Sequence, residues 1–191
     1  PLYYCITANK KIMEIEKIIT ERLILRKVEQ SDASSILKGL SNDKLTKYML
    51  IRYYNLSEVQ EQMDFYSNHF NNKTGAYWLI ELKNNHTPIG VIGINDIHYS
   101  NKKCELGYWL YPEFWNNGYI VEAAKNVIDF CFDKLQLNRI EADVETENTA
   151  SISIMKKLGF IHEGTLREFE MNNSKLIDLM KFALLKRDVQ H

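Results

Sequence analysis

The stretch from residue 105 to 122, ELGYWLYPEFWNNGYIVE, contains the residues best suited to bind an anion. An alternating strand pattern stops at Pro112, a short polar loop ends at Gly118, and an apolar helical spacing follows. The first amides of a helix have no partner within it, and the helix dipole is positive there. Gly118 lets a phosphate approach those amides because it carries no side chain. Taken alone, such a segment is more often an ordinary strand–helix turn.

A second segment, ENTASISIMKKLGF (147–160), sets Asn148, Ser151 and Gly159 at fixed spacing after the next expected strand. Together the two segments resemble the GNAT acetyltransferases, whose patterns are Q/R-x-x-G-x-G/A after the fourth strand and N-x-x-A/S-x-x-L/I-Y/F-x-K-x-G-F on the following helix. The stretches TERLILR, PIG, YWLYPEFWNNGY and EGTLRE resemble the Rim-type branch, which holds the ribosomal-protein N-terminal acetyltransferases. The resemblance covers residues 18 to about 187. It implies an N-acetyltransferase that uses acetyl-coenzyme A as co-substrate.

The resemblance assigns most coenzyme contacts to the main chain. It implies that the amides from Trp115 to Ile120 hold the diphosphate and that the strand edge from Trp109 to Tyr111 pairs with the pantetheine amides. Asn148 is expected to reach the pantetheine arm near the thioester. Trp115 replaces the usual Gln or Arg of the loop, which costs little where the contacts are to backbone. The expected coenzyme-binding residues are Trp109, Leu110, Tyr111, Trp115, Asn116, Asn117, Gly118, Tyr119, Ile120, Asn148 and Ser151.

The proton donor to the departing thiolate needs a substitute in this chain. Met155 lies where many relatives carry the tyrosine that protonates the thiolate, and a thioether has no proton to give. Ser151, one helical turn earlier, is the catalytic residue we expect in its place. The alternative is that Ser151 is only a small helix residue that packs well.

The general base is expected to be Glu105. Strand alternation puts Glu105 on the same face as Gly107 and Trp109 near the centre of the sheet, where it could act through a water molecule. A solvated glutamate at a strand end is the alternative. A backbone amide near Leu110 is the expected oxyanion donor. Rival bases on a later strand are Glu163, Glu168 and His162.

Composition excludes several classes of protein and site. The chain has 24 Lys plus Arg against 25 Asp plus Glu, so its charge of -1 argues against nonspecific nucleic-acid binding. Its three cysteines include no CxxC pair, which makes a disulfide framework or a structural zinc site unexpected and indicates a reducing, cytoplasmic compartment. No apolar run approaches the roughly 20 residues of a membrane span. No metal cofactor and no membrane partner are expected.

The elements that must position these residues fit one domain. Strands are expected at 22–28, 76–82, 88–97, 103–111 and 139–145, followed by a closing antiparallel pair around the turn NNSK. Helices are expected at 32–40, at 55–71 with a capping pattern at Ser57 and Gln60, at 118–135, and at 149–158 with Gly159 as C-cap. We predict an α+β fold with a mixed, mostly antiparallel sheet flanked by helices. The resemblance adds splayed central strands around the thioester.

Domain limits and acceptor follow from the same reasoning. Residues 1–17 are expected to form an N-terminal extension partly outside the fold, and residues 18–188 the single GNAT domain. A protein N-terminus, as in ribosomal proteins, is the acceptor that the resemblance implies. The alternatives are a polyamine, amino acid or antibiotic amine, or a CoA-binding sensor without turnover. Acceptor recognition is assigned to Lys47–Asn55 and Phe169–Lys175, and the closing strands could pair across a homodimer.

Overall fold

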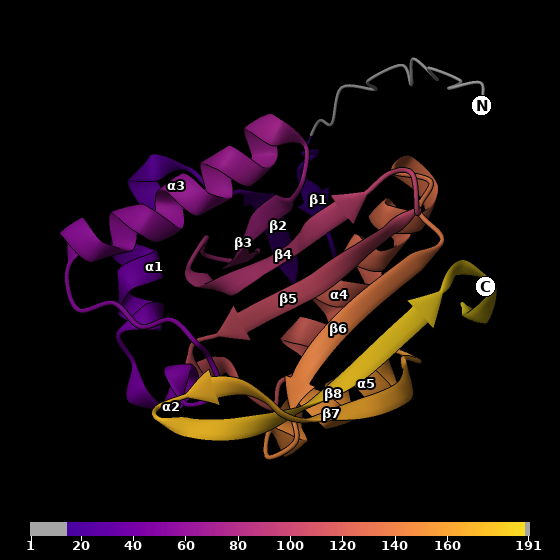
Figure 1. Cartoon of the computed structure of the whole chain (residues 1–191). Helices are drawn as coiled ribbons and strands as arrows, with labels where there is room; N and C mark the ends of the chain where they lie inside the picture. Colours follow the sequence, from indigo (N-terminus) through magenta and orange to yellow (C-terminus); the bar gives the residue numbers. More distant parts are fainter. Residues whose placement is uncertain (1–14, 190–191) are drawn as a thin grey trace, which may run out of the picture.

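Eight strands form a single sheet with helices on both faces in the computed structural model, which describes residues 15–189 (Figure 1). The strand order is β1-β2-β3-β4-β5-β6-β8-β7. Every neighbouring pair is antiparallel except β5 and β6, which are parallel. The strands are β1 (Ile18–Ile19), β2 (Leu23–Lys27), β3 (Ala76–Leu82), β4 (Pro88–His98), β5 (Lys103–Leu110), β6 (Arg139–Glu145), β7 (Ile161–Asn172) and β8 (Lys175–Leu185).

The helices divide between the two faces (Figure 1). They are α1 (Ala33–Leu40), α2 (Asp43–Thr46), α3 (Leu56–Asn72), α4 (Tyr119–Asp129) and α5 (Thr149–Lys157). A π-helical turn, Phe130–Lys134, continues α4, and short 3-10 turns lie at Gln30–Asp32, Pro112–Phe114 and Lys186–Asp188. The predicted α+β fold, a mixed and mostly antiparallel sheet flanked by helices, is confirmed. Most of the expected N-terminal extension, residues 1–17, lies outside the described residues, and its limits stay a prediction.

Two apolar cores lie on opposite faces of the sheet, because successive strand side chains point to opposite sides. On one face α4 and α5 cover buried residues such as Trp78, Leu106 and Phe182. On the other face α1 and α3 cover Leu79, Val91 and Trp109. Alternation along β5 therefore sends Leu106, Tyr108 and Leu110 toward α4 and α5. It sends Glu105, Gly107 and Trp109 toward the opposite face.

The central strands separate after a short parallel contact. β5 and β6 pair over three positions, Lys103 with Arg139, Cys104 with Ile140, and Glu105 with Glu141. β5 then continues to Leu110 and β6 to Glu145 along diverging paths (Figure 1). The predicted splay is confirmed, and it leaves one edge of β5 available beyond Glu105.

The helix α3 begins at a different cap from the one expected. Asn55 is the N-cap, and its side chain accepts a hydrogen bond from the amide of Glu58 at 3.0 Å. The Glu58 carboxylate in turn accepts from the amide of Tyr54 at 2.7 Å. The predicted cap at Ser57 with Gln60 is therefore wrong. Asn55 forms the cap because asparagine is among the strongest capping residues and adopts the extended backbone that the position needs.

A buried ion cluster ties the first long strand to its neighbours. Arg26 on β2 donates to both carboxylate oxygens of Asp32, each at 2.8 Å, and to Glu81 on β3 at 2.7 Å. Both acidic side chains are more than 90% buried. Because a buried carboxylate is stable only with a partner, Arg26 holds β2, β3 and the 3-10 turn in one arrangement.

Candidate active site

The loop between β5 and α4 presents a glycine at the start of a helix. Gly118 is the N-cap of α4 with φ 77°, and its carbonyl accepts the first intrahelical bond, from the amide of Glu122 at 3.1 Å. The amides of Tyr119, Ile120 and Val121 precede that bond and have no partner within the helix. A Cβ built on Gly118 would meet no atom nearer than 3.6 Å. Space beside unpaired amides at a positive helix end fits an anion such as a diphosphate.

The side chains of this loop bind its own carbonyl groups. Asn117 Nδ2 donates to the carbonyl oxygens of Trp115 at 2.9 Å and Phe114 at 3.2 Å. Trp115 Nε1 donates to the carbonyl oxygen of Leu110 at 2.8 Å. The Asn117 carbonyl accepts from Arg22 Nη1 at 3.0 Å. The Trp115 amide donates to the Pro112 carbonyl at 3.2 Å, so of the expected donors only the amides from Asn116 to Ile120 remain to bind a ligand.

The open edge of β5 consists of alternate residues. The amide of Tyr111 bonds to Ile89 of β4 at 2.9 Å, so Tyr111 and Trp109 direct their backbone groups toward β4. Tyr108 and Leu110 direct theirs toward the gap with β6. Of the three residues expected at this edge, Leu110 alone faces the gap, and its amide points there while its carbonyl is taken by Trp115. Strand alternation could have identified Tyr108 as the second edge residue, and the sequence analysis missed it.

The start of α5 lies on the same face as Tyr108. Asn148 is the N-cap of α5, and its Oδ1 accepts from the amide of Ser151 at 3.1 Å, which leaves Nδ2 for a ligand. Met155 is fully buried in the core. The Tyr108 hydroxyl is buried and makes no hydrogen bond of normal geometry to the described residues. Burial raises the pKa of Tyr108 to about 12, and the neighbouring Ser151 hydroxyl opposes that rise.

Glu105 lies on the opposite face, at the last paired position before the strands separate. Burial raises the pKa of Glu105, and the carboxylates of Asp143 and Asp96 raise it further against the opposing effect of Lys181. Lys181 Nζ lies 2.6 Å from Asp143 Oδ2. A carboxylate whose pKa is raised toward neutrality is a better general base than a solvated one.

The sheet surface beside Glu105, formed by Gly107 and Gly93 and called here the glycine floor, is open. Gly107 is exposed although it lies in a central strand, and a Cβ on it would meet nothing within 4 Å. Gly93 pairs with Gly107 on β4, and the Tyr77 ring lies against it, since a Cβ on Gly93 would come within 2.2 Å of that ring. The Tyr77 hydroxyl is buried without a hydrogen-bond partner in the described chain. An acceptor can therefore approach Glu105 across a glycine floor.

The rival bases all lie on the edge strand β7, which β6 and β8 separate from β5. Arg139 holds Glu163 by two hydrogen bonds of 2.9 and 2.6 Å and lowers the pKa of that carboxyl. His162 is exposed and lies 3.1 Å from the Thr165 hydroxyl. Glu168 is exposed within a bulge of β7 and has φ 49°. The environments of these residues favour Glu105 as the base.

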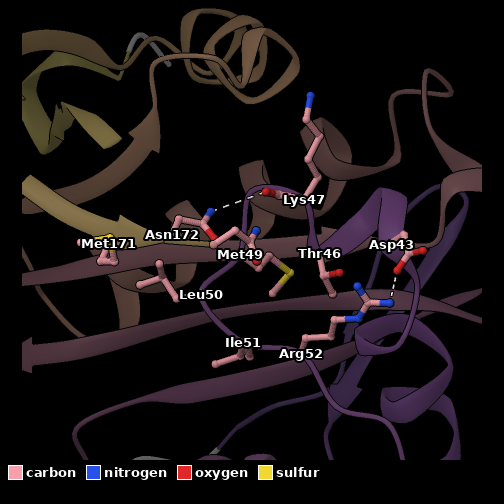
Figure 2. A pocket seen from close by; sticks show the side chains of 10 residues that line it. Asp43, Thr46, Lys47, Met49, Leu50, Ile51, Arg52, Met171 and Asn172 are labelled. Atoms are coloured by element: carbon pink, nitrogen blue, oxygen red, sulfur yellow. Dashed lines mark hydrogen bonds and ion pairs between the residues drawn. The ribbon is translucent and has the colours of Figure 1, made fainter. Parts of the chain in front are cut away.

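A pocket of about 300 Å³ joins the two segments expected to recognise the acceptor (Figure 2). Asn172 Nδ2 lies 3.5 Å from the Lys47 carbonyl oxygen and 3.4 Å from Glu145 Oε2. Arg52 is paired with Asp43 on the far wall. Since Glu145 ends β6, the pocket adjoins the wide end of the gap between the central strands. Its lining residues are Asp43, Thr46, Lys47, Met49, Leu50, Ile51, Arg52, Met171, Asn172 and Asn173.

Within residues 15–189, no three His, Cys, Asp or Glu side chains are grouped as a metal site requires. In the same part of the chain, no helix combines the length and apolarity needed to cross a bilayer.

Comparison with known proteins identifies the family. The family model described as "Acetyltransferase (GNAT) domain" matches residues 22–161. The chain is 38% identical over 175 residues to "Uncharacterized N-acetyltransferase p20" of Bacillus licheniformis, which covers 91% of this chain and 98% of that protein.

Solved structures agree on the fold. Spermidine N-acetyltransferase from Vibrio cholerae, in complex with CoA and spermine, superposes with a TM-score of 0.78 at 23% identity and covers 87% of this chain and 97% of its own. Ribosomal-protein-S5-alanine acetyltransferase from Vibrio fischeri superposes with a TM-score of 0.80 at 21% identity and covers 92% and 100%. The chain therefore belongs to the GNAT acetyltransferase family and is an N-acetyltransferase that uses acetyl-coenzyme A.

Proposed function

We propose that this acetyltransferase acts on the α-amine of a protein N-terminus, with Glu105 as its general base. The observation that carries the proposal is the position of Glu105, a carboxyl of raised pKa beside the open floor at Gly107, where β5 and β6 separate. A base there can take a proton from an amine that enters over Gly107 and faces the gap. An N-terminal α-amine has a pKa near 8, so part of it is already neutral near pH 7.

The coenzyme is proposed to bind along the gap between β5 and β6, on the side of α4 and α5. The amides from Asn116 to Ile120 would hold its diphosphate, which the free space at Gly118 supports. The Leu110 amide points into the gap and is suited to bind a pantetheine carbonyl or the thioester oxygen. Asn148 Nδ2 would bind the pantetheine arm. When bound, acetyl-CoA supplies the activated acetyl group, and the protein supplies position and proton transfer.

The placement of these residues defines where each proton goes. Glu105 accepts the proton of the incoming ammonium through a water molecule, and the free amine nitrogen bonds to the acetyl carbon. As the carbon–sulfur bond breaks, Ser151 gives its hydroxyl proton to the sulfur and recovers, through water, the second proton that the amide nitrogen loses. Ser151 suits this role because it lies at the start of α5 beside the gap, whereas Met155 one turn later is buried in the core and has no proton to donate.

An extended acceptor is favoured by the pocket between Lys47–Arg52 and Met171–Asn173 (Figure 2). Asn172 in that pocket lies 3.4 Å from Glu145 at the end of β6, so the pocket could take the residues that follow the acetylated one. The similarity to ribosomal-protein-S5-alanine acetyltransferase supports the same class. A polyamine is the second candidate, because Asp96 and Asp143 place two more carboxylates near Glu105 and one similar structure is a spermidine N-acetyltransferase.

An acceptor panel tests the proposal. Purified protein would be given acetyl-CoA with short peptides bearing free N-termini, the same peptides with blocked N-termini and one lysine, and spermidine, while thiol release is measured. The highest kcat/KM is expected for peptides with free N-termini. A preference for spermidine, or equal rates on blocked lysine peptides, would overturn the α-amine assignment and leave the acetyltransferase activity intact.

Two further parts of the proposal concern the cellular compartment and the oligomeric state. Cys104 and Cys131 are free thiols buried in the core, as a reducing cytoplasm would keep them. A homodimer through the closing strands is proposed because β7 is a long edge strand that exposes Ile161, Phe169 and Met171. Sedimentation of the protein would test this part directly.

A further inference from the structure

The segment before β2 reaches the start of α4, although the two are far apart in the chain. Arg22 Nη1 donates to the Asn117 carbonyl at 3.0 Å, and Arg22 Nε lies 2.7 Å from Glu122 Oε2. The Arg22 guanidinium also stacks over the Tyr119 ring, with 4.6 Å from its carbon to the ring centre. Arg22 thus contacts the loop and the first turn of α4 at three points.

These contacts leave one nitrogen of Arg22 for another partner. Nε and Nη1 are used, while Nη2 lies 3.6 Å from the point where a Cβ on Gly118 would be. That point marks the free space beside the unpaired amides of α4. A phosphate oxygen that enters this space comes within hydrogen-bond reach of Nη2, and the Arg22 side chain is 43% exposed and so accessible to a ligand.

Glu122 needs such an arginine if an anion is to bind. A carboxylate in the first turn of α4 would repel a diphosphate at the same helix end. Its Oε1 accepts from the Thr20 hydroxyl at 2.5 Å and the Arg22 amide at 2.8 Å, and Arg22 Nε binds the other oxygen. Glu122 therefore fixes the guanidinium in place, Arg22 offsets its charge, and the Thr20 hydroxyl donates a hydrogen bond to it.

We infer that Arg22 is a diphosphate-binding residue, with Nη2 donating to the coenzyme above Gly118. The inference rests on the proposed binding mode for the coenzyme. It gives Thr20 and Arg22, at the start of the stretch TERLILR, a role in the active site. The diphosphate is then held between the amides of α4 and a side chain from the β1–β2 turn, so ligand binding ties together two parts of the chain that are distant in sequence.

A purely structural role for Arg22 makes a different prediction. If Arg22 only braced the loop through Asn117 and Glu122, Arg22→Lys and Arg22→Gln would weaken CoA binding equally, because neither side chain keeps both contacts. If Arg22 donates to the diphosphate, lysine keeps a charge for the phosphate, and CoA binding weakens less in Arg22→Lys than in Arg22→Gln. Acetyl-pantetheine, which carries the thioester arm without the diphosphate, shows whether the rest of the site is intact in each variant.

The experiment measures CoA affinity by calorimetry and kcat/KM with both thioesters for the wild type, Arg22→Gln and Arg22→Lys. Arg22→Gln should weaken CoA binding about 10-fold or more, as expected for one lost charged hydrogen bond, with kcat/KM on acetyl-pantetheine unchanged within about twofold. Arg22→Lys keeps the charge without the fork and should lose less. The matched control is Arg187→Gln, since Arg187 is 82% exposed at the far end of the chain and should leave both values unchanged.

Three results would overturn the inference while the proposed function stands: unaltered CoA affinity in Arg22→Gln, equal CoA affinity in Arg22→Gln and Arg22→Lys, or equal losses with both thioesters. Failure of the wild type to bind CoA would remove the proposed binding mode itself. Should Arg22→Gln fail to fold, Arg22→Met replaces it in the comparison with Arg22→Lys, and the same difference between the two variants decides.

Discussion

Replacing Gly118 with alanine separates the cost to the fold from the cost to the ligand. Gly118 has φ 77°, a left-handed conformation that costs an L-residue about 1 kcal/mol. The added Cβ would meet no protein atom within 3.6 Å, so no clash increases that cost. For a chain of this length, about 1 kcal/mol lowers Tm by about 2–4 °C. The protein should therefore fold.

Coenzyme binding should suffer far more. The new methyl group occupies the space beside the amides of Tyr119 and Ile120, so a diphosphate must move away from them. Each charged hydrogen bond lost is worth about 1.5–3 kcal/mol, so Kd for CoA should rise about 10-fold or more. Calorimetric titration with CoA measures this directly.

Gly159→Ala is the matched control. Gly159 has φ 83° at the end of α5, and a Cβ there would lie 3.8 Å from Leu184. Its backbone strain equals that at Gly118, but it lies away from the start of α4. Gly159→Ala should lose the same few degrees of Tm and keep its CoA affinity. If the two variants bind CoA equally well, the diphosphate does not lie at Gly118.

Three other substitutions test the remaining assignments. Glu105→Gln should lower kcat by about 10²- to 10⁴-fold, and an unchanged kcat would exclude this base. Because folding raises the pKa of Glu105, its ionisation costs the wild type stability as pH rises through that pKa. The Tm of Glu105→Gln should therefore exceed that of the wild type at pH 7 but not at pH 4. Ser151→Ala should lower kcat while CoA affinity holds, and a normal turnover would place the proton donor elsewhere. Arg26→Met should cost about 3 kcal/mol by denaturant unfolding, since Asp32 and Glu81 lose their shared partner, and a loss under 1 kcal/mol would contradict a buried ion cluster.

Much of the fold could be predicted from local sequence patterns. The strands at 76–82 and 139–145 match their predicted limits residue for residue, because alternation and turn residues mark both ends. The two-residue β1 and the four-residue α2 were not predicted, since neither is long enough to show a period. The helix expected to run to Leu135 changes to a π turn at Phe130, and apolar spacing cannot distinguish the two helix types.

The candidate site likewise has parts that the sequence predicts and parts that require the fold. The candidate loop at Gly118 is one contiguous segment, so spacing and glycine position suffice to predict it. The partner of Asn117 could not be found from spacing, because Arg22 lies 95 residues away in the chain. The choice between Glu105 and Glu163 also required the fold. Only there does Arg139 pair with Glu163, and only there do Asp96 and Asp143 approach Glu105.

The carboxylates around Glu105 also bear on the choice of acceptor. Asp96 and Asp143 attract any ammonium group, but the charge of that ammonium offsets their repulsion of Glu105 and lowers its pKa again. The proton must then move from the amine to a weaker base. For an α-amine of pKa about 8 this transfer is easier than for an alkylamine of pKa about 10.4, and the difference of about 2.4 units corresponds to about 3.3 kcal/mol. If Glu105 is the base for an ammonium bound beside these carboxylates, the site suits the more acidic amine, which supports the proposed α-amine of a protein N-terminus.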